Sequence, residues 1–323
     1  MEQRPRLGVS RCLLGDKVRY DGGHKADPFI LQSLGAHVEW VPVCPEVEIG
    51  MGTPRESVHL LSDPDGVPVV DERVRLVGVR SGDDWTRRMA DWASRRSRAL
   101  EKERLAGFVF KKDSPSCGLE RVRVHHPRKA VTRTGRGLFA HAVTDGHPDL
   151  PVEEEGRLHD PRLRENFIER VFAFTRVRAL FEGRWTHGSL VAFHTAHKLQ
   201  LLAHSRVRYT ELGRLVADGS RLDRQTLAEK YRRTFMAGLS VMATPGKHAD
   251  VMLHMLGHLK TKVTDADRAE LLRLVEEYRR GILPLVVPLT VFQHHVRVHE
   301  VAYLRGQTYL EPHPRELALR NHV

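Results

Sequence analysis

The sequence predicts two domains of different fold class: an α/β domain with a mostly parallel, Rossmann-like sheet, followed by an all-α domain. In the first half, short apolar runs typical of buried strands alternate with helical patterns. In the second half only helical patterns recur. The 323 residues are enough for two hydrophobic cores. We therefore place the α/β domain at residues 1–158 and the all-α domain at 183–323, joined by a helix at 159–182.

The first elements alternate as the α/β class requires. A short buried strand is expected over residues 6–10, and a second over 37–43. Between them, residues 27–34 have a helical pattern, and Gly35 follows as a typical helix-ending glycine. A cysteine lies just past the end of each of these two strands.

The next elements continue the alternation. Residues 69–70 and 74–79 are expected to pair as a hairpin, with Pro68 at an edge position because proline cannot donate to a ladder. A long helix is expected from about 83 to 105. A strand at 107–110 follows it and leads towards the third cysteine.

The second half holds five further helical patterns. The pattern over 264–281 is well marked, because Thr264 is a typical N-cap, acidic residues fill the first turn and Gly281 ends the helix. The other four patterns cover residues 189–207, 223–242, 247–260 and 289–305. No strand-like alternation and no internal repeat interrupts them.

Composition favours a globular, cytoplasmic protein. Hydrophobic residues make up 41% of the chain and charged residues 29%. No apolar run approaches the roughly 18 residues that cross a bilayer. The N-terminal residues also lack the apolar region of a signal peptide. We therefore expect a cytoplasmic location and no membrane partner.

The net charge of +11 is unevenly distributed along the chain. Residues 1–158 hold 26 basic and 24 acidic residues, whereas residues 159–323 hold 26 and 17. A near-neutral half joined to a basic half favours a catalytic domain beside a domain that binds a polyanion. An arginine-rich, solvated surface would give the same counts, so charge alone leaves both interpretations open.

Three cysteines, Cys12, Cys44 and Cys117, are too few for a disulfide framework. Such residues are buried apolar side chains, nucleophiles or metal ligands. Each lies just past a predicted strand, and open parallel sheets bind ligands outside the carboxyl ends of their strands. Glycine, proline or serine lies within three residues of each cysteine, which is typical of tight loops. We therefore expect the three cysteines to converge and act together.

Three cysteine motifs and a glycine-rich turn carry a family resemblance. They are SRCLLG at 10–15, RYDGG at 19–23, VCPEV at 43–47 and SPSCG at 114–118. Together they resemble the signature of the 2-thiouracil desulfidase family. The resemblance covers about residues 5–157 and includes the GRG turn at 135–137.

The second half resembles a family of largely uncharacterised, all-α bacterial domains. HTAHKL at 194–199 and the KYRR region at 230–233 carry this resemblance. Such domains occur alone or fused to the desulfidase domain. Fusions of this kind resemble enzymes that remove sulfur from 4-thiouridine in tRNA.

The resemblance implies a [4Fe–4S] cluster that Cys12, Cys44 and Cys117 bind, which leaves one iron open. An open metal position is typical of catalytic sites, and the soft sulfur of a thiocarbonyl suits iron. We expect a hydrolytic desulfidase that acts on thiolated uracil, with 4-thiouridine in tRNA as substrate and uridine and sulfide as products. No net oxidation is required.

Two side chains near the cysteines are candidates for proton transfer. Glu46, two residues after Cys44, is expected to be the general acid/base. Ser114, three residues before Cys117, resembles the catalytic serine of the family, and Ser116 is a weaker candidate. A surface carboxylate and a loop-capping serine are the alternatives.

The basic residues of the second half are expected to bind tRNA. The candidates are Lys198, Arg206, Lys230, Arg232 and Arg233. Tyr209 and Tyr231 lie among them and could stack on bases. The histidine pairs 194/197 and 254/258 each share a helix face, but no carboxylate or cysteine completes a metal signature, so a basic face is favoured.

Two other functions fit part of the sequence. One keeps the enzyme class and makes free 2-thiouracil or a related small thio-base the substrate. The other is a non-catalytic iron–sulfur protein that binds nucleic acid and senses oxygen or iron. The basic second half disfavours the first, and Glu46 beside the cysteines disfavours the second.

Overall fold

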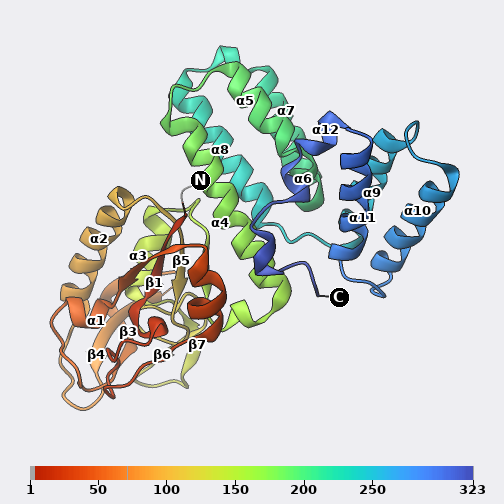
Figure 1. Cartoon of the computed structure of the whole chain (residues 1–323). Helices are drawn as coiled ribbons and strands as arrows, with labels where there is room; N and C mark the ends of the chain where they lie inside the picture. Colours follow the sequence, from red (N-terminus) through yellow and green to blue (C-terminus); the bar gives the residue numbers. More distant parts are fainter. Residues whose placement is uncertain (1–3, 71, 323) are drawn as a thin grey trace. The chain divides into compact units, whose positions relative to one another are not determined.

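The computed structural model describes residues 4–70 and 72–322, and these divide into two compact units between Asp160 and Pro161. The first unit is α/β, and the second is helical over its described residues (Figure 1). The predicted fold class is therefore confirmed. Over the described ranges, no helix is both long and apolar enough to cross a membrane.

A four-stranded parallel sheet forms the centre of the α/β unit. Its strands, in the order β2-β1-β5-β8, are β2 (Glu39–Val43), β1 (Arg6–Ser10), β5 (Leu105–Phe110) and β8 (Val152–Glu154). Every residue of β5 is buried, as expected for a central strand that is covered on both faces. β1 pairs with β2 on one side and with β5 on the other. Strand addition therefore reverses direction at β1, the place where open α/β sheets bind ligands.

The sequence predicts the second sheet only in part. Its order is β4-β3-β6-β7, with bounds β3 (Val58–Val69), β4 (Glu72–Gly78), β6 (Val122–His125) and β7 (Thr132–Gly135). The expected hairpin is present, and Val69 pairs with Glu72. However, β3 begins much earlier and its register shifts between Ser62 and Val67. The intervening DPDG segment interrupts the alternation by which a strand is detected.

Three α-helices and one irregular helical segment complete the first unit. The helices are α1 (Pro45–Glu48), α2 (Thr86–Lys102) and α3 (Leu138–Gly146). The single helix expected at 27–34 is instead a π-helical turn, Phe29–Ser33, followed by a 3-10 turn, Leu34–Ala36. Gly35 lies inside this second turn without a positive φ, so the expectation that it ends the helix is wrong. The irregular winding buries both Ile30 and Leu34 completely.

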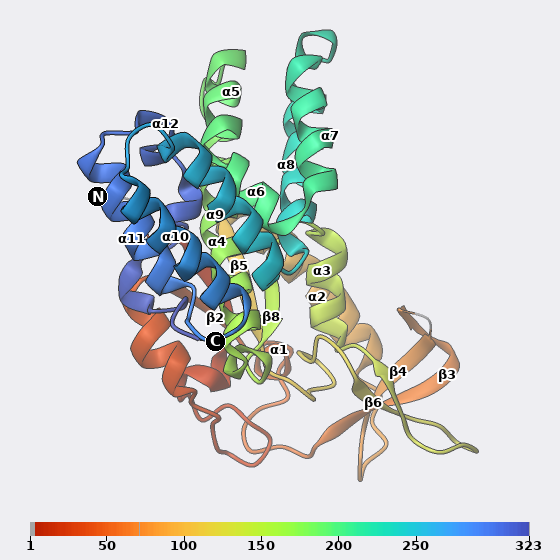
Figure 2. The same ribbon diagram turned by 90° about the vertical axis from the view of Figure 1, so that its right-hand side faces the viewer.

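The second unit contains nine α-helices within its described residues. They are α4 (Pro161–Glu182), α5 (His187–Ala196), α6 (Lys198–His204), α7 (Arg206–Ala217), α8 (Arg224–Ser240), α9 (Pro245–Leu259), α10 (Asp265–Arg279), α11 (Val286–Val298) and α12 (Ala302–Arg305). Helices α7 and α8 run side by side (Figures 1 and 2). Helices α9, α10 and α11 form a second packed group around a common apolar core.

The helix expected over 189–207 is divided into parts. His197 has φ −101° and ψ 5°, which separates α5 from α6. Ser205 is extended and its side chain accepts a hydrogen bond from the backbone of Arg208, so it starts α7 as an N-cap. The sequence patterns predict no helix between residues 207 and 223, and this prediction is wrong because α7 continues to Ala217. The Ser205 cap is a signal that could have revealed α7, although no Glu or Gln follows it three residues later.

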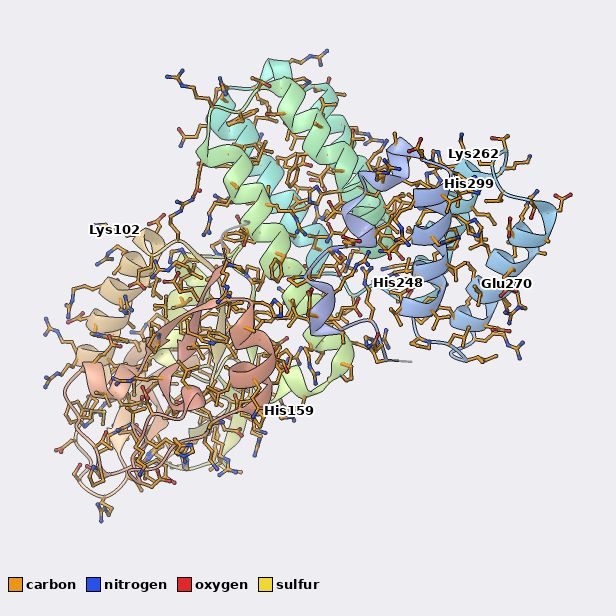
Figure 3. All side chains as sticks on the ribbon, in the orientation of Figure 1. Lys102, His159, His248, Lys262, Glu270 and His299 are labelled. Carbon is orange, nitrogen blue, oxygen red and sulfur yellow. The ribbon has the colours of Figure 1, made fainter. Side chains whose placement is uncertain are left out.

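A buried charged network holds the helical unit together. The carboxylate of Glu169 on α4 lies 3.3 Å from Nε2 of His204 and accepts a hydrogen bond from Gln200 at 2.7 Å. Glu165, one turn earlier, accepts a hydrogen bond from Arg320 at 3.0 Å. His248 projects from α9 and bonds to the hydroxyl of Tyr309 at 2.8 Å (Figure 3). Because these groups are buried, each needs its partner to offset lost hydration.

The Glu169–His204 pair should make stability depend on pH. Burial raises the pKa of Glu169, but the attraction to His204 and other smaller contributions together lower it by more, so the net shift is downward. For His204, burial lowers the pKa and Glu169 raises it, and the net shift is upward. Because its pKa is depressed, Glu169 makes its full contribution to the free energy of unfolding above about pH 4.3. Because its pKa is raised, His204 makes its full contribution below about pH 6.5. The histidine's share is lost as pH rises through its folded pKa.

We therefore expect His204→Gln to cost more stability near pH 5.5 than near pH 8.5. Urea unfolding of the wild type and the variant at both pH values measures this difference. His254→Gln, an exposed histidine of α9, is the matched control and should change little at either pH. A His204→Gln cost that is equal at the two pH values would contradict a charged pair.

Candidate functional site

The three cysteines lie at the carboxyl ends of three adjacent parallel strands. Cys12 lies in the 3-10 turn Arg11–Leu14 after β1, and Cys44 directly follows β2 and caps α1. Cys117 lies in the loop after β5. Because β2, β1 and β5 are neighbours in the sheet, their ends meet at one edge. All three cysteines line one cavity of about 460 Å³, the room of roughly fifteen water molecules.

The thiols share a desolvated environment. Burial and, to a smaller extent, the nearby Glu46 carboxylate raise the pKa of Cys12 to about 11 and that of Cys44 to about 12. Burial also raises the pKa of Cys117, with further upward contributions from Glu46 and the other two cysteines. As protein groups alone, the thiols therefore prefer to stay protonated. Thiolates at this place require a positive group to compensate their charge.

Glu46 projects into the cavity beside Cys44. The sulfur of Cys44 donates to Oε2 of Glu46 at 3.7 Å, and the guanidinium of Arg55 lies 3.8 Å from the same oxygen. The side chain of Glu46 is only 12% exposed. Arg55 also donates to the backbone oxygens of Val18 and Gly52, at 3.0 and 2.9 Å, which fixes its position. Glu46 is thus a nearly buried carboxylate that one arginine orients.

Sequence reasoning did not select Arg55. It lies nine residues after Glu46, in a loop with no regular period, so nothing local in the sequence links the two side chains. Only the fold of this loop, in which the backbone of Arg55 donates to the oxygen of Tyr20, brings it to the cavity.

Ser114 holds the loop that carries Cys117. Its Oγ accepts hydrogen bonds from the backbone of Ser116 at 3.2 Å and of Cys117 at 3.0 Å. Ser114 lines the cavity, and no acceptor for its own proton is found among the described residues. Ser116 is fully buried and is absent from the cavity lining, so it does not share the role expected of Ser114.

Helix α3 and the GRG turn support this loop from beneath. Backbone N–H groups at the start of α3 donate to the loop carbonyls: Leu138 to Pro115, and Phe139 and Ala140 to Ser116. These bonds satisfy donors that a helix N-terminus otherwise leaves unpaired. Gly137 passes so close that an added Cβ would lie 2.4 Å from the carbonyl carbon of Ser116. The last glycine of the GRG turn is therefore a packing requirement of the cysteine loop.

Two buried carboxylates at the end of β8 anchor the other side of the loop. Glu154 accepts a hydrogen bond from the backbone of Leu119 at 2.7 Å. Glu155 accepts one from the backbone of Lys112 at 2.7 Å and pairs with the Lys111 ammonium. Sequence reasoning missed both residues, because they are more than thirty positions away from the segment that they hold.

The lining of the cavity is basic. Its cations are Arg11, Arg19, Lys25, Arg55, Lys111, Lys112 and Arg123, and its carboxylates are Glu46, Glu56 and Asp113. Tyr20 lies at the rim with its ring 45% exposed and the Arg19 guanidinium 5.3 Å from the ring centroid. The excess of positive charge favours ligands that carry negative charge.

Comparison with known proteins places the chain. A family model described as 2-thiouracil desulfurase matches residues 7–155, and one described as a protein of unknown function (DUF1722) matches residues 198–314. The chain is 34% identical over 163 residues to the uncharacterized protein YbgA of Escherichia coli (strain K12), covering 50% of this chain and 95% of that protein. Residues 7–155 of this chain belong to the 2-thiouracil desulfurase family.

Two further matches cover parts of this desulfurase-family chain. The uncharacterized protein YbbK of Bacillus subtilis (strain 168) is 32% identical over 110 residues, which is 34% of this chain and 71% of that protein. A solved structure, described as the [4Fe-4S]-dependent thiouracil desulfidase TudS, is 27% identical. That match covers 48% of this chain and 94% of the other, with a TM-score of 0.37.

The helical unit of this family member places the expected RNA-binding residues on three helices. Lys198 begins α6, Arg206 begins α7, and Lys230, Arg232 and Arg233 lie on α8. Tyr209 is half-buried. The expectation that Tyr231 stacks on bases is wrong, because its ring is fully buried and its hydroxyl bonds to Nδ1 of His194 at 3.1 Å.

The histidines of this unit are distributed between its core and its surface. His194 and His197 are buried, and Nδ1 of His197 bonds to the backbone oxygen of Phe193 at 2.8 Å. The rings of His254 and His258 lie 5.2 Å apart on an exposed part of α9. Within the described parts of the chain, no three His, Cys, Asp or Glu side chains form a group that could hold a single metal ion.

We expect Gly137→Ala to loosen the Cys117 loop, because the new methyl group meets backbone that cannot rotate away. The substitution should lower the free energy of unfolding by about 1–3 kcal/mol. It should also make Cys117 react faster with a thiol reagent under native conditions. Gly213→Ala on α7, where a Cβ meets nothing within 4 Å, is the control and should destabilise nothing. Unchanged Cys117 reactivity in Gly137→Ala would show that the close approach does not matter.

Proposed function

We propose that this chain is a [4Fe–4S]-dependent desulfidase that converts a thiolated uracil to uracil, with 4-thiouridine in tRNA as its substrate. The observation that carries the proposal is the meeting of three cysteines and Glu46 in one cavity, at the point where strand order reverses. Membership of the 2-thiouracil desulfurase family supports the same reaction class.

The residues present fit an iron–sulfur cluster. The donor set consists of three thiols, the ligands that such clusters require, in a cavity with room for far more than one ion. Cys12, Cys44 and Cys117 would hold the cluster. Because only three cysteines would hold it, the bound cluster would keep one iron without a protein ligand and would supply there a soft Lewis acid for the thiocarbonyl sulfur. The basic residues around the cavity would offset the negative charge of the thiolates.

The reaction balances without an oxidant or a reductant. Water adds to the ring carbon, the carbon–sulfur bond breaks, and the products are the oxo-uracil and hydrogen sulfide. In this proposal Glu46 accepts a proton from the water and returns it to the departing sulfur. Arg55 orients the Glu46 carboxylate, and the free hydroxyl proton of Ser114 can be donated to a substrate atom or to Glu46. The buried position of Glu46 limits its contact with bulk water.

The choice of tRNA over a free base rests on charge. The second half carries nine more basic than acidic residues, and cations also surround the cavity. A free thio-base is small and neutral and would gain little from either feature, whereas a polyanion gains from both. A stacked uridine would have to be turned out of the RNA to enter the cavity, as in other base-modifying enzymes.

The decisive measurement is anaerobic incubation of cluster-reconstituted protein with tRNA that contains 4-thiouridine. We expect loss of the thiouridine chromophore matched by release of sulfide. Turnover of free 2-thiouracil without turnover of tRNA would identify small thio-bases as the substrates instead of tRNA. Turnover of neither would favour the iron–sulfur sensor.

Substitution should separate cluster binding from proton transfer. Each of Cys12→Ala, Cys44→Ala and Cys117→Ala should lower the iron content and abolish desulfuration. Glu46→Gln should keep the iron but lower kcat by about 10²–10⁴-fold, as expected for loss of a general acid/base. Glu39→Gln, an exposed carboxylate of β2, is the control for loss of charge. A fully active Glu46→Gln enzyme would remove Glu46 from the mechanism.

Charge reversal on α8 should separate tRNA from small substrates. We expect Lys230→Glu with Arg233→Glu to raise KM for thiolated tRNA and to leave turnover of free thiouracil unchanged. Both side chains are exposed, so the fold should tolerate the change. Arg280→Glu at the end of α10 is a matched control. Equal losses on tRNA and on the free base would contradict a role of this helix in RNA binding.

A further inference from the structure

Four helices of the second unit bring a lysine, two tyrosines and two histidines together at the surface. Nζ of Lys198 on α6 lies 6.0 Å from the ring centroid of Tyr209 on α7. The ring of Tyr303 on α12 lies 4.6 Å from that of His258 on α9. His258 is next to His254, at 5.2 Å between ring centroids. We call these five residues the lysine–tyrosine surface.

The two parts of this surface are within electrostatic reach of each other. Burial raises the pKa of Tyr303, the Lys198 ammonium lowers it, and Tyr209 raises it. Gln307 also connects the two parts, because it accepts a hydrogen bond from the backbone of Leu199, the residue after Lys198, and donates one to the backbone oxygen of Tyr303. Arg206 adds a second cation, because it precedes Tyr209 by one turn of α7 and shares its side of the helix.

The polar groups of this surface have no partner within the described residues. No hydrogen bond or ion pair engages Nζ of Lys198, the guanidinium of Arg206, or the hydroxyls of Tyr209 and Tyr303. The contrast with α10 is clear, because Arg273 pairs with Glu270 and Glu277 there, and Arg279 pairs with Glu276. Arg273 and Arg279 of α10 are thus neutralised by neighbouring carboxylates, whereas Lys198 and Arg206 are not.

The rings are held in place by the packing beneath them. Tyr209 lies nearly parallel to the buried His194, with 6.1 Å between ring centroids, and the hydroxyl of Tyr231 fixes His194 from below. Burial and the charge of Lys198 lower the pKa of His194 to about 4, so this histidine is neutral at physiological pH. Lys198, Tyr209 and Tyr303 are all half-buried, which limits the side-chain freedom that binding would have to remove.

Aromatic rings beside unpaired cations are the chemistry that recognises single-stranded nucleic acid. A base gains about 1–3 kcal/mol by stacking on an aromatic ring, and an ammonium takes the adjoining phosphate. We propose that the lysine–tyrosine surface binds an unpaired nucleotide of the substrate RNA, with the base against the tyrosine rings and the phosphate on Lys198. The inference rests on the proposed function only in identifying that RNA as the thiolated tRNA.

This proposal gives the helical unit a role different from general charge attraction. Cations on α8 attract any polyanion, double-stranded or single-stranded. A stacking site requires a base whose face is free, so it selects loops, bulges and ends of a folded RNA. The helical unit would then favour RNA that presents an unpaired nucleotide at a fixed place.

The test is tRNA affinity of the full chain, measured by fluorescence anisotropy with an unmodified tRNA transcript at several salt concentrations. Tyr209→Leu and Tyr303→Leu should each weaken binding roughly five- to hundredfold, whereas Tyr209→Phe and Tyr303→Phe should bind nearly as the wild type does. Lys198→Ala should make the slope of log K against log salt shallower by about 0.7. Arg280→Ala on α10 is the control and should lower the slope less.

Competition separates an unpaired nucleotide from other partners. A single-stranded oligonucleotide should displace tRNA from the wild type, and a blunt RNA duplex of equal length should do so poorly. Equal competition by the duplex, or affinities and salt slopes that none of the variants changes, would overturn the proposal. Binding of an acidic protein partner alone, with no RNA affinity, would also overturn it.

Turnover distinguishes this proposal from the proposed function. If the wild type desulfurates thiolated tRNA and the tyrosine variants bind and react equally well, the function stands and the surface proposal fails. If the wild type binds tRNA through this surface but releases no sulfide from it, the surface proposal stands and the proposed substrate fails. Retained turnover of free thiouracil in the variants shows that the α/β unit is intact.

Discussion

The candidate site depends on the parallel pairing of β1 with β2 on one side and β5 on the other. This pairing fixes where the three strands end, and each strand then delivers its cysteine to the same edge of the sheet. The register leaves little freedom, because a shift by one residue would turn every side chain of a strand to the other face. Such a shift would be costly because Gly8 makes room for the ring of Phe108, which would lie 2.1 Å from a Cβ at that position.

The site also depends on contacts that hold the loop around Cys117 in place. It begins after the central strand β5, and its groups are held from three directions: by Ser114 within the loop, by the first turn of α3, and by Glu154. Several backbone groups of the loop that burial would leave unsatisfied are paired by these contacts. The loop can therefore place a buried thiol at a defined position without regular secondary structure.

The two units differ in where their unpaired charged groups lie. In the α/β unit, two buried thiols, the half-buried thiol of Cys12 and one nearly buried carboxylate lie in a cavity with a basic lining, an arrangement suited to a charged ligand group at the centre. In the helical unit, the charges of the interior are paired with each other, as in Glu169–His204 and Glu165–Arg320. The unpaired charges of Lys198 and Arg206 instead lie at its surface, where they are available to a partner.

The sequence by itself was sufficient to predict the fold class, the convergence of the three cysteines and the position of Glu46 beside them, because these predictions depend on local signals. Strand runs, glycine-rich loops and short motifs lie within a few residues of one another, so they can be detected without the fold. Tertiary structure alone decided the role of Arg55, the anchoring by Glu154 and Glu155, and the burial of Tyr231. Each of these depends on contact between segments far apart in the chain. A charged or aromatic side chain has the same local pattern whether it faces solvent or a partner, and only packing distinguishes the two.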